Sequence, residues 1–164
     1  ANMPHYEHAG LLQQKNMQGD TDWVVKSMNV KTPSRRTQIG SLSGGNQQKV
    51  VIGRWLLTKP DILMLDEPTN GLDPSGIHEI RNLVKSLPSL YNCTVLISSH
   101  MLSEIELIAN DIGILNHGRL LFEGSMNDLR QYALQSGFAA DNLEDVFLSI
   151  VEKDNTERKR RARL

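Results

Sequence analysis

Two adjacent carboxylates, Asp66 and Glu67, follow the short apolar run 62–65. Such a run predicts a strand that is buried on both faces and ends at the two acids. Successive side chains of an extended chain point in opposite directions, so the two acids would do different jobs. In phosphoryl transfer one carboxylate holds Mg²⁺ and another group positions the attacking water. From this motif alone, phosphoryl-transfer chemistry and a polar strand end that caps the next turn are equally favoured interpretations.

A second candidate lies upstream, where Ser43, Gly44 and Gly45 lead into a helix predicted from about Asn46. Glycines let a backbone approach an anion closely, and a helix N-terminus presents N–H groups and the positive end of the helix dipole. Ser43 adds a hydroxyl donor. The segment therefore suits phosphate binding, although an ordinary Ser or Asn cap after a flexible turn has the same composition.

The elements around the two acids are predicted to form a strand–helix–strand unit. The helix is indicated by apolar residues at steps of three, four and three, and it is expected to end at Pro88. The next apolar run, 94–98, predicts a second buried strand, and short crossover connections of this kind make the two strands parallel. The apolar stripe of the helix consists of Ile77, Ile80, Val84 and Leu87.

Polar residues at the ends of both strands are expected to line one crevice, because ligands of open α/β sheets bind at the carboxyl ends of the strands. The second strand contributes Ser99 and His100. A histidine in this place could donate a hydrogen bond to a phosphate, while a lone histidine beside a strand end is more often structural. The turn at 70–74, with Asp73, is by itself unremarkable.

Elsewhere the patterns predict mostly helices. One is expected after Asp20, with a break at 32–34, and a short one over 101–109. A strand pair is predicted over 111–124, turning at 116–119, followed by helices that begin after Ser125 and after Asp141. Cys93, the only cysteine, excludes an internal disulfide and suits a buried core position.

The net charge of −1 conceals an asymmetry. Residues 1–152 hold 12 basic and 17 acidic side chains, and residues 153–164 hold six basic and two acidic ones. The acidic body argues against a broad nucleic-acid surface, whereas the basic end could touch phosphates or anionic lipid. A frayed, solvated terminus is the favoured interpretation of 153–164. With no apolar run near the roughly 20 residues that span a bilayer, and no signal-peptide pattern, the chain is expected in the cytosol or at a membrane surface.

Four ordered motifs together resemble the ATP-binding cassette (ABC) ATPases of ABC transporters. About fifteen specified positions match in order and spacing, which leaves coincidence negligible. The resemblance is strong over about residues 30–124. It implies an α/β fold of the P-loop NTPase kind, with a partial parallel sheet flanked by helices and a small helical subdomain. The motifs are Leu42 to Gln48, Ile62 to Thr69, Gly71 to Pro74, and Ser98 to His100.

The resemblance also implies a role for each motif. Asp66 would hold Mg²⁺ and Glu67 would be the general base that orients the hydrolytic water. His100 would sense the γ-phosphate of ATP, and Asp73 would communicate across a cassette dimer. The signature motif would contact ATP held by the opposite cassette through Ser43, Gly44, Gly45 and Gln48.

The phosphate-cradling pattern Gly-x-x-x-x-Gly-Lys-Ser/Thr is not found in these 164 residues. The resemblance therefore predicts a sheet that lacks a central strand and a chain that alone binds Mg-ATP poorly and hydrolyses little of it. The segment 28–34 and the extended signature through Val51 look like the second cassette of sugar-importer ATPases. Residues from Thr69 onward look like drug and peptide-antibiotic exporters, as if joined near Asp66.

From this resemblance we expect residues 1–124 to form a cassette-like domain, with a helical part over 1–60 and a catalytic part over 61–124, followed by C-terminal helices over 125–152 and the basic end. The implied partners are a second cassette, identical or different, and a transmembrane permease at the cytoplasmic face of the membrane, with no nucleic acid. An alternative is a non-catalytic module that docks on a complete cassette or on a membrane subunit.

Overall fold

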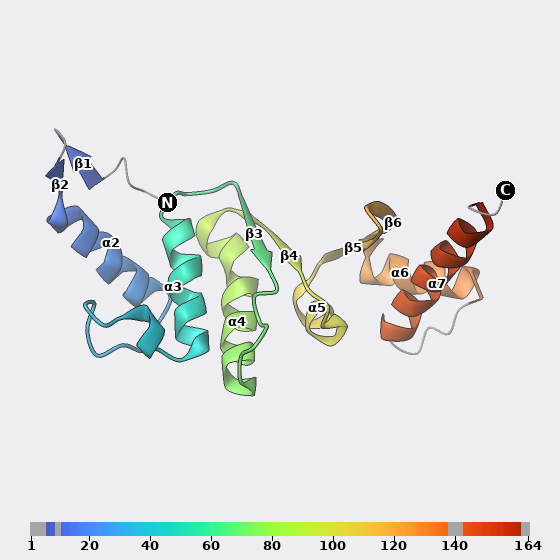
Figure 1. Ribbon diagram of the computed structural model, residues 1–164, viewed down its shortest axis with the longest axis horizontal. Helices are drawn as coiled ribbons and strands as arrows, with labels where there is room; N and C mark the ends of the chain where they lie inside the picture. The colour runs from blue at the N-terminus through green and yellow to red at the C-terminus, as the bar shows by residue number, and fades with distance from the viewer. Residues whose placement is uncertain (1–5, 9–10, 138–142, 162–164) are drawn as a thin grey trace. The chain divides into compact units, whose positions relative to one another are not determined.

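The computed structural model describes residues 6–8, 11–137 and 143–161. The chain divides into two compact units, residues 1–99 and 100–164, and Figure 1 shows their elements along the chain. The first unit holds everything through β4, and the second holds α5 to α7. Within the described ranges, no helix combines the length and the apolar character that a membrane crossing requires.

The first unit opens with a small helical part. Strands β1 (Glu7–His8) and β2 (Leu11–Leu12) pair antiparallel and lead into α2 (Gln14–Ser27). This helix begins earlier than the sequence predicts, because residues 14–19 include good helix formers but no recognisable capping signal. A 3₁₀ turn, η1 (Ile39–Ser41), precedes α3 (Gly44–Leu56).

Helices α2 and α3 pack closely because Gly53 has no side chain. A methyl group at Gly53 would lie 2.7 Å from Cγ1 of Val24 and 2.8 Å from Cγ of Met28. Val24 and Met28 are buried, as is Ile52 beside the glycine. This contact fixes α3, which begins with the predicted phosphate-binding segment.

The predicted strand–helix–strand unit is confirmed. Strand β3 (Ile62–Asp66) leads through α4 (Pro74–Tyr91) to β4 (Thr94–Ser98), and the two strands pair in parallel with Asp66 opposite Ser98. Among the described residues, each of the two strands pairs only with the other. This narrow parallel sheet, joined by a helix, is the α/β arrangement that the sequence predicts, although the helices of the described ranges cover only one of its faces.

Three expectations about this unit are wrong in detail, one of them being the burial of β4, in which no residue is buried. Strand β3 is buried on one face only, since Leu63 and Leu65 are buried whereas Ile62 and Met64 are 61% and 73% exposed. The described residues thus cover one side of the sheet, although the sequence is apolar on both sides. Helix α4 also continues through Pro88 to Tyr91 and ends at Asn92 in the left-handed conformation. A proline near the end of a helix removes one backbone donor, and here the last turn remains helical despite that loss.

The second unit is a hairpin covered by helices. After the short α5 (Leu102–Ile108), strands β5 (Asp111–Asn116) and β6 (Arg119–Ser125) pair antiparallel. The predicted turn is confirmed, with positive φ at both His117 and Gly118, as tight hairpins require. Helices α6 (Met126–Gln135) and α7 (Leu143–Arg161) complete the unit. Its buried core consists of Ile114, Leu129, Ala133, Leu143, Val146 and Ile150.

The basic end of the chain differs from the expected frayed terminus. Helix α7 continues through Arg161, so residues 153–161 are helical, and most of them are exposed. The middle of α7 is bound to the hairpin by Asp154, which is 6% exposed and accepts hydrogen bonds from Arg119 Nη1 and Asn116 Nδ2, both at 2.9 Å. A buried carboxylate with two donors anchors the middle of the helix and lets the helical conformation extend beyond it. Asp141, predicted to precede this helix, lies outside the described residues.

Candidate functional site

Asp66 and Glu67 lie at the carboxyl end of β3, as predicted, but in different environments. Asp66 is exposed, and its Oδ1 accepts a hydrogen bond from the hydroxyl of Ser98, its register partner on β4. Glu67 is half-buried, and its backbone N–H donates to the carbonyl of Ser98 at 3.1 Å. The end of β4 therefore positions both acids, one through a side chain and the other through the backbone.

Glu67 has an uncommon backbone conformation. Its φ is +47°, in the left-handed region that non-glycine residues rarely adopt. The conformation ends the strand and begins a turn in which Asn70 N–H donates to the Glu67 carbonyl at 3.0 Å.

Ser43 is the N-cap residue of α3, and Gly44 and Gly45 form the first turn. The Ser43 side chain makes no capping hydrogen bond to the backbone in the described part of the chain. Its hydroxyl instead accepts from Asn46 Nδ2 at 2.8 Å, and Asn46 Oδ1 accepts from the backbone N–H of Lys31 at 2.8 Å. The uncapped first turn retains the N–H groups and the dipole that favour an anion.

The glycines of this segment lie against the start of α4. A methyl group at Gly45 would approach the Cα of Gly76 to 3.3 Å, and one at Gly44 would approach Cδ2 of Leu72 to 2.9 Å. Asp73 is the N-cap of α4 and accepts from Gly76 N–H at 2.9 Å. The structure thus brings the 43–45 segment together with the loop that carries Asp73, a proximity that the sequence alone does not show.

An ion-pair cluster between α3 and α4, formed by Lys49, Lys31 and Glu79, is not predicted by the sequence analysis. Lys49 on α3 is 4% exposed, and its Nζ contacts Glu79 Oε2 on α4 at 2.6 Å and the Asn29 carbonyl at 3.2 Å. Lys31 contacts the other Glu79 oxygen at 3.0 Å. Hydrogen bonds from Lys49 and Lys31 lower the pKa of Glu79 to about 2. A lysine inside the apolar stripe of α3 is the signal that could have indicated it.

Two further predicted residues complete the set. Gln48 is half-buried in the second turn of α3. His100 is exposed and opens the second unit, just before α5, whereas all the other predicted site residues belong to the first unit. No cluster of three or more His, Cys, Asp or Glu side chains suited to a metal occurs among the described residues. Asp66 with the Ser98 hydroxyl offers oxygen donors, which Mg²⁺ prefers, and Mg²⁺ commonly takes only one or two carboxylates beside phosphate and water.

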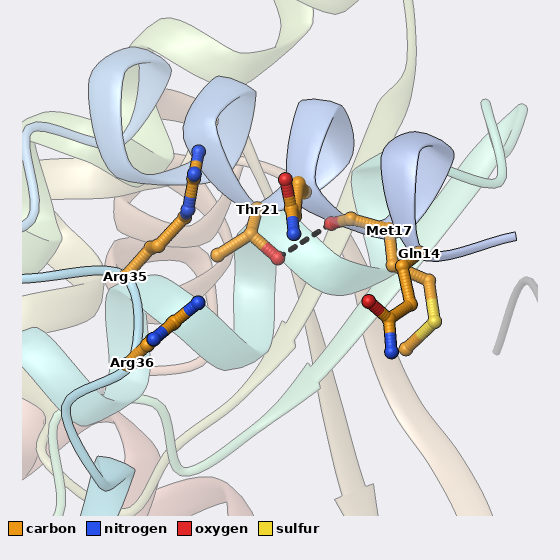
Figure 2. Close-up of a pocket in the computed structure, with 6 residues that line it drawn as sticks. Gln14, Met17, Thr21, Arg35 and Arg36 are labelled. Atoms are coloured by element: carbon orange, nitrogen blue, oxygen red, sulfur yellow. Dashed lines mark hydrogen bonds between the residues drawn. The ribbon is translucent and has the colours of Figure 1, made fainter.

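A hollow elsewhere in the first unit is unrelated to these residues. Figure 2 shows a pocket of about 220 Å³ between one face of α2 and the loop that carries Arg35 and Arg36. Thr21 at its wall donates to the Met17 carbonyl at 2.7 Å, and Arg35 is paired with Asp22 at 2.6 Å. None of the predicted site residues lines this pocket.

Solved structures with the same fold are ATP-binding parts of ABC transporters. The structure of an ATP binding subunit of an ABC transporter matches with a TM-score of 0.65 at 23% identity, over 91% of this chain and 60% of that chain. CbiO1 from Clostridium perfringens, part of the transporter complex cbiONQ, matches with a TM-score of 0.62 at 25% identity, over 77% of this chain and 53% of that chain. These likenesses confirm the predicted P-loop NTPase fold.

Residues 3–70 match the family model described as ABC transporter. The chain therefore contains part of the ATPase domain of the ABC transporter family. Among curated proteins it is similar to the galactose/methyl galactoside import ATP-binding proteins MglA of Mannheimia succiniciproducens, at 53% identity over 121 residues, and of Vibrio cholerae, at 52% over 120. Each match covers 73% of this chain and 24% of the relative, so the chain spans about a quarter of their length.

The predicted resemblance to sugar importers is confirmed by these relatives. An aligned stretch that covers 73% of a 164-residue chain necessarily includes the middle of the chain, with Asp66, Glu67 and Asp73. The importer likeness therefore crosses the position near Asp66 where the sequence suggests a change of subfamily. The exporter-like character of the second half stays a prediction.

Proposed function

We propose that this chain supplies two parts of a nucleotide-binding domain that couples ATP binding and hydrolysis to transport, namely the signature motif and the strand end that carries Asp66 and Glu67. The observation that carries the proposal is the packing of residues 43–45 against residues 72–76, with Gly45 and Gly76 in close approach. Segments that would face a second cassette thereby form one surface of the first unit. In this proposal residues 1–124 are the cassette-like part, and residues 125–152 are C-terminal helices attached to it.

The individual roles are those that the resemblance to ABC ATPases implies, and the placement of the residues supports them. Ser43, Gly44, Gly45 and Gln48 would contact the γ-phosphate of ATP on the opposite cassette, where N–H groups of an uncapped helix stabilise negative charge. Asp73 would connect the two cassettes. These five positions lie at the beginnings of α3 and α4, which pack against each other.

The acids and the histidine would serve the hydrolytic step. Asp66 and the Ser98 hydroxyl suit a bound Mg²⁺, which would neutralise phosphate charge. Glu67 would accept a hydrogen bond from the attacking water and orient it, acting as general base. His100 would donate a hydrogen bond to the γ-phosphate. The separate environments of Asp66 and Glu67 support this division of labour.

The proposed partners are a second cassette and a transmembrane permease, which would hold the chain at the cytoplasmic face of a membrane. The names of the relatives favour a galactose-type sugar as the transported substrate and import as the direction. Nucleic acid is not a proposed partner, because the body of the chain is acidic.

The test combines this chain with the intact Escherichia coli relative, which is 51% identical over 119 residues. ATP hydrolysis by the mixture is measured with the parent chain, with Ser43→Arg, and with Ser41→Arg, which places the same bulk and charge on the exposed Ser41 of η1. We expect the parent chain and the Ser41→Arg chain to change the ATP turnover of the relative by the same amount. The Ser43→Arg chain should leave the turnover of the relative unchanged.

Two results would contradict parts of the proposal. A response that survives Ser43→Arg would favour docking of this chain as a non-catalytic module over action of its signature motif. Turnover by the chain alone that Glu67→Gln abolishes would contradict the expectation that the chain is nearly inactive without a partner.

A further inference from the structure

Four consecutive cations, Arg158, Lys159, Arg160 and Arg161, form the last turn of α7. All four are exposed. In the described part of the chain, none of them forms an ion pair with an acidic side chain. We call this group the α7 basic end. Its positive charge is not neutralised by the fold.

The α7 basic end stands beyond the packed part of its helix. The last buried residue of α7 is Asp154. At 1.5 Å per residue, Arg161 lies about 10 Å further along the helix axis.

The interaction of cations with the helix dipole does not account for the whole group. That interaction needs no uninterrupted run of four charges. Because consecutive residues of a helix are rotated by about 100°, the four side chains point to all sides of the axis. Any flat surface that meets this end of the helix therefore meets at least two cations, whatever the rotation of the helix.

We propose that the α7 basic end is a docking surface for the anionic phospholipid headgroups of a membrane. Clusters of four or more Lys or Arg side chains are attracted to the negative surface potential of anionic lipids, and the core contacts of α7 at Leu143, Val146 and Ile150 leave the α7 basic end exposed. A nucleic acid would need a broad basic face, which the acidic body does not offer. The proposal goes beyond nucleotide chemistry and uses no residue of the candidate site.

The test is co-sedimentation of the 164-residue chain with vesicles in 0.1 M salt. Vesicles of phosphatidylcholine with about one third phosphatidylserine are compared with pure phosphatidylcholine. One variant replaces all four residues of the α7 basic end by Gln. A matched variant replaces four exposed helical cations elsewhere by Gln, namely Lys15, Lys26, Lys85 and Arg130. Circular dichroism establishes that both variants keep their helical content.

We expect the parent and the matched variant to bind only the anionic vesicles, with binding that weakens as salt is raised. Each cation near an anionic surface contributes about 1 kcal/mol, or about fivefold, so two contacting cations give about 25-fold. The partition coefficient of the α7 variant should therefore fall at least about 25-fold. Replacement of its three arginines by lysine should preserve binding, because the attraction depends on charge.

Three results would overturn the proposal. The first is equal binding to both kinds of vesicle, and the second is equal loss of binding in the two Gln variants. The third is salt-sensitive binding to a 20-base-pair DNA duplex that requires the α7 basic end, without binding to anionic vesicles, which would assign this surface to a nucleic acid instead.

Discussion

Replacement of Glu79 by Gln tests how the ion pair between α3 and α4 stabilises the first unit. The side chain of Lys49 is 5% exposed and that of Glu79 is 29% exposed, and their charged atoms are 2.6 Å apart. Glutamine keeps the shape and one acceptor but removes the negative charge. Lys49 would then remain buried with the Asn29 carbonyl, at 3.2 Å, and a neutral amide as its acceptors.

The expected loss is about 2 kcal/mol in the free energy of unfolding of the first unit. Removal of one partner of a fully buried ion pair costs about 3–5 kcal/mol. The pKa of Glu79, lowered to about 2 from an ordinary value near 4.3, gives an upper value of about 3 kcal/mol. Both values must be reduced because solvent reaches the Glu79 carboxylate and screens its charge.

The same loss should depend on pH in a defined direction. The folded state lowers the pKa of Glu79, so the unfolded state binds more protons at acidic pH. The stabilisation is therefore complete above about pH 5 and disappears as the pH falls toward 2. The difference between the parent and Glu79→Gln should shrink over this interval.

Tryptophan fluorescence during urea unfolding is the assay. Both tryptophans of the chain, Trp23 and Trp55, belong to the first unit, so the signal reports that unit alone. The matched variant is Lys31→Gln, which removes the other partner of Glu79. The side chain of Lys31 is 70% exposed, and we expect a loss of only about 0.5 kcal/mol. Equal losses in the two variants, or a loss in Glu79→Gln that does not change with pH, would refute the reasoning.

Two further predictions concern local packing and capping. Gly45→Ala should destabilise the first unit by about 1–3 kcal/mol, since the new methyl group would lie 3.3 Å from Gly76 Cα, whereas Gly40→Ala, with nothing within 4 Å, should change its stability little. Urea unfolding measures the stability of both variants. Equal stabilities would show that α3 and α4 can move apart to admit the methyl group without loss of stability. Ser125→Ala should speed amide exchange in the first turn of α6, because Ser125 forms a capping box with Asp128 that is worth about 1 kcal/mol. Unchanged exchange would contradict this role of the cap.

The parts of the fold that follow from short-range patterns were predictable. The parallel strands 62–66 and 94–98, the helix between them and the hairpin at 116–119 all have periodicities or turn residues that specify them locally. The ends of elements were less predictable. Helix α4 passes through Pro88, next to the buried Leu87, and α7 continues to Arg161 beyond its last buried residue, Asp154, because the preceding helical turns outweigh local signals.

The candidate site shows the same division. The types and spacing of Asp66, Glu67 and Ser43 indicate phosphate chemistry from sequence. The approach of Gly45 to Gly76 is different, since it joins two segments 31 positions apart and depends on how α3 and α4 pack. Burial of Lys49 also depends on that packing, because a lysine is normally a surface residue.

At position 67 the left-handed backbone makes glutamate less favourable for stability than glycine, whereas the proposed chemistry needs the glutamate carboxylate. A non-glycine residue in this region costs about 1–2 kcal/mol, whereas glycine adopts it without that cost. Selection for thermal stability alone would therefore favour Gly at position 67 and remove the carboxylate. Persistence of a glutamate here through many generations would require a selective benefit from its side chain, and directed evolution for stability should be paired with a screen that preserves that group.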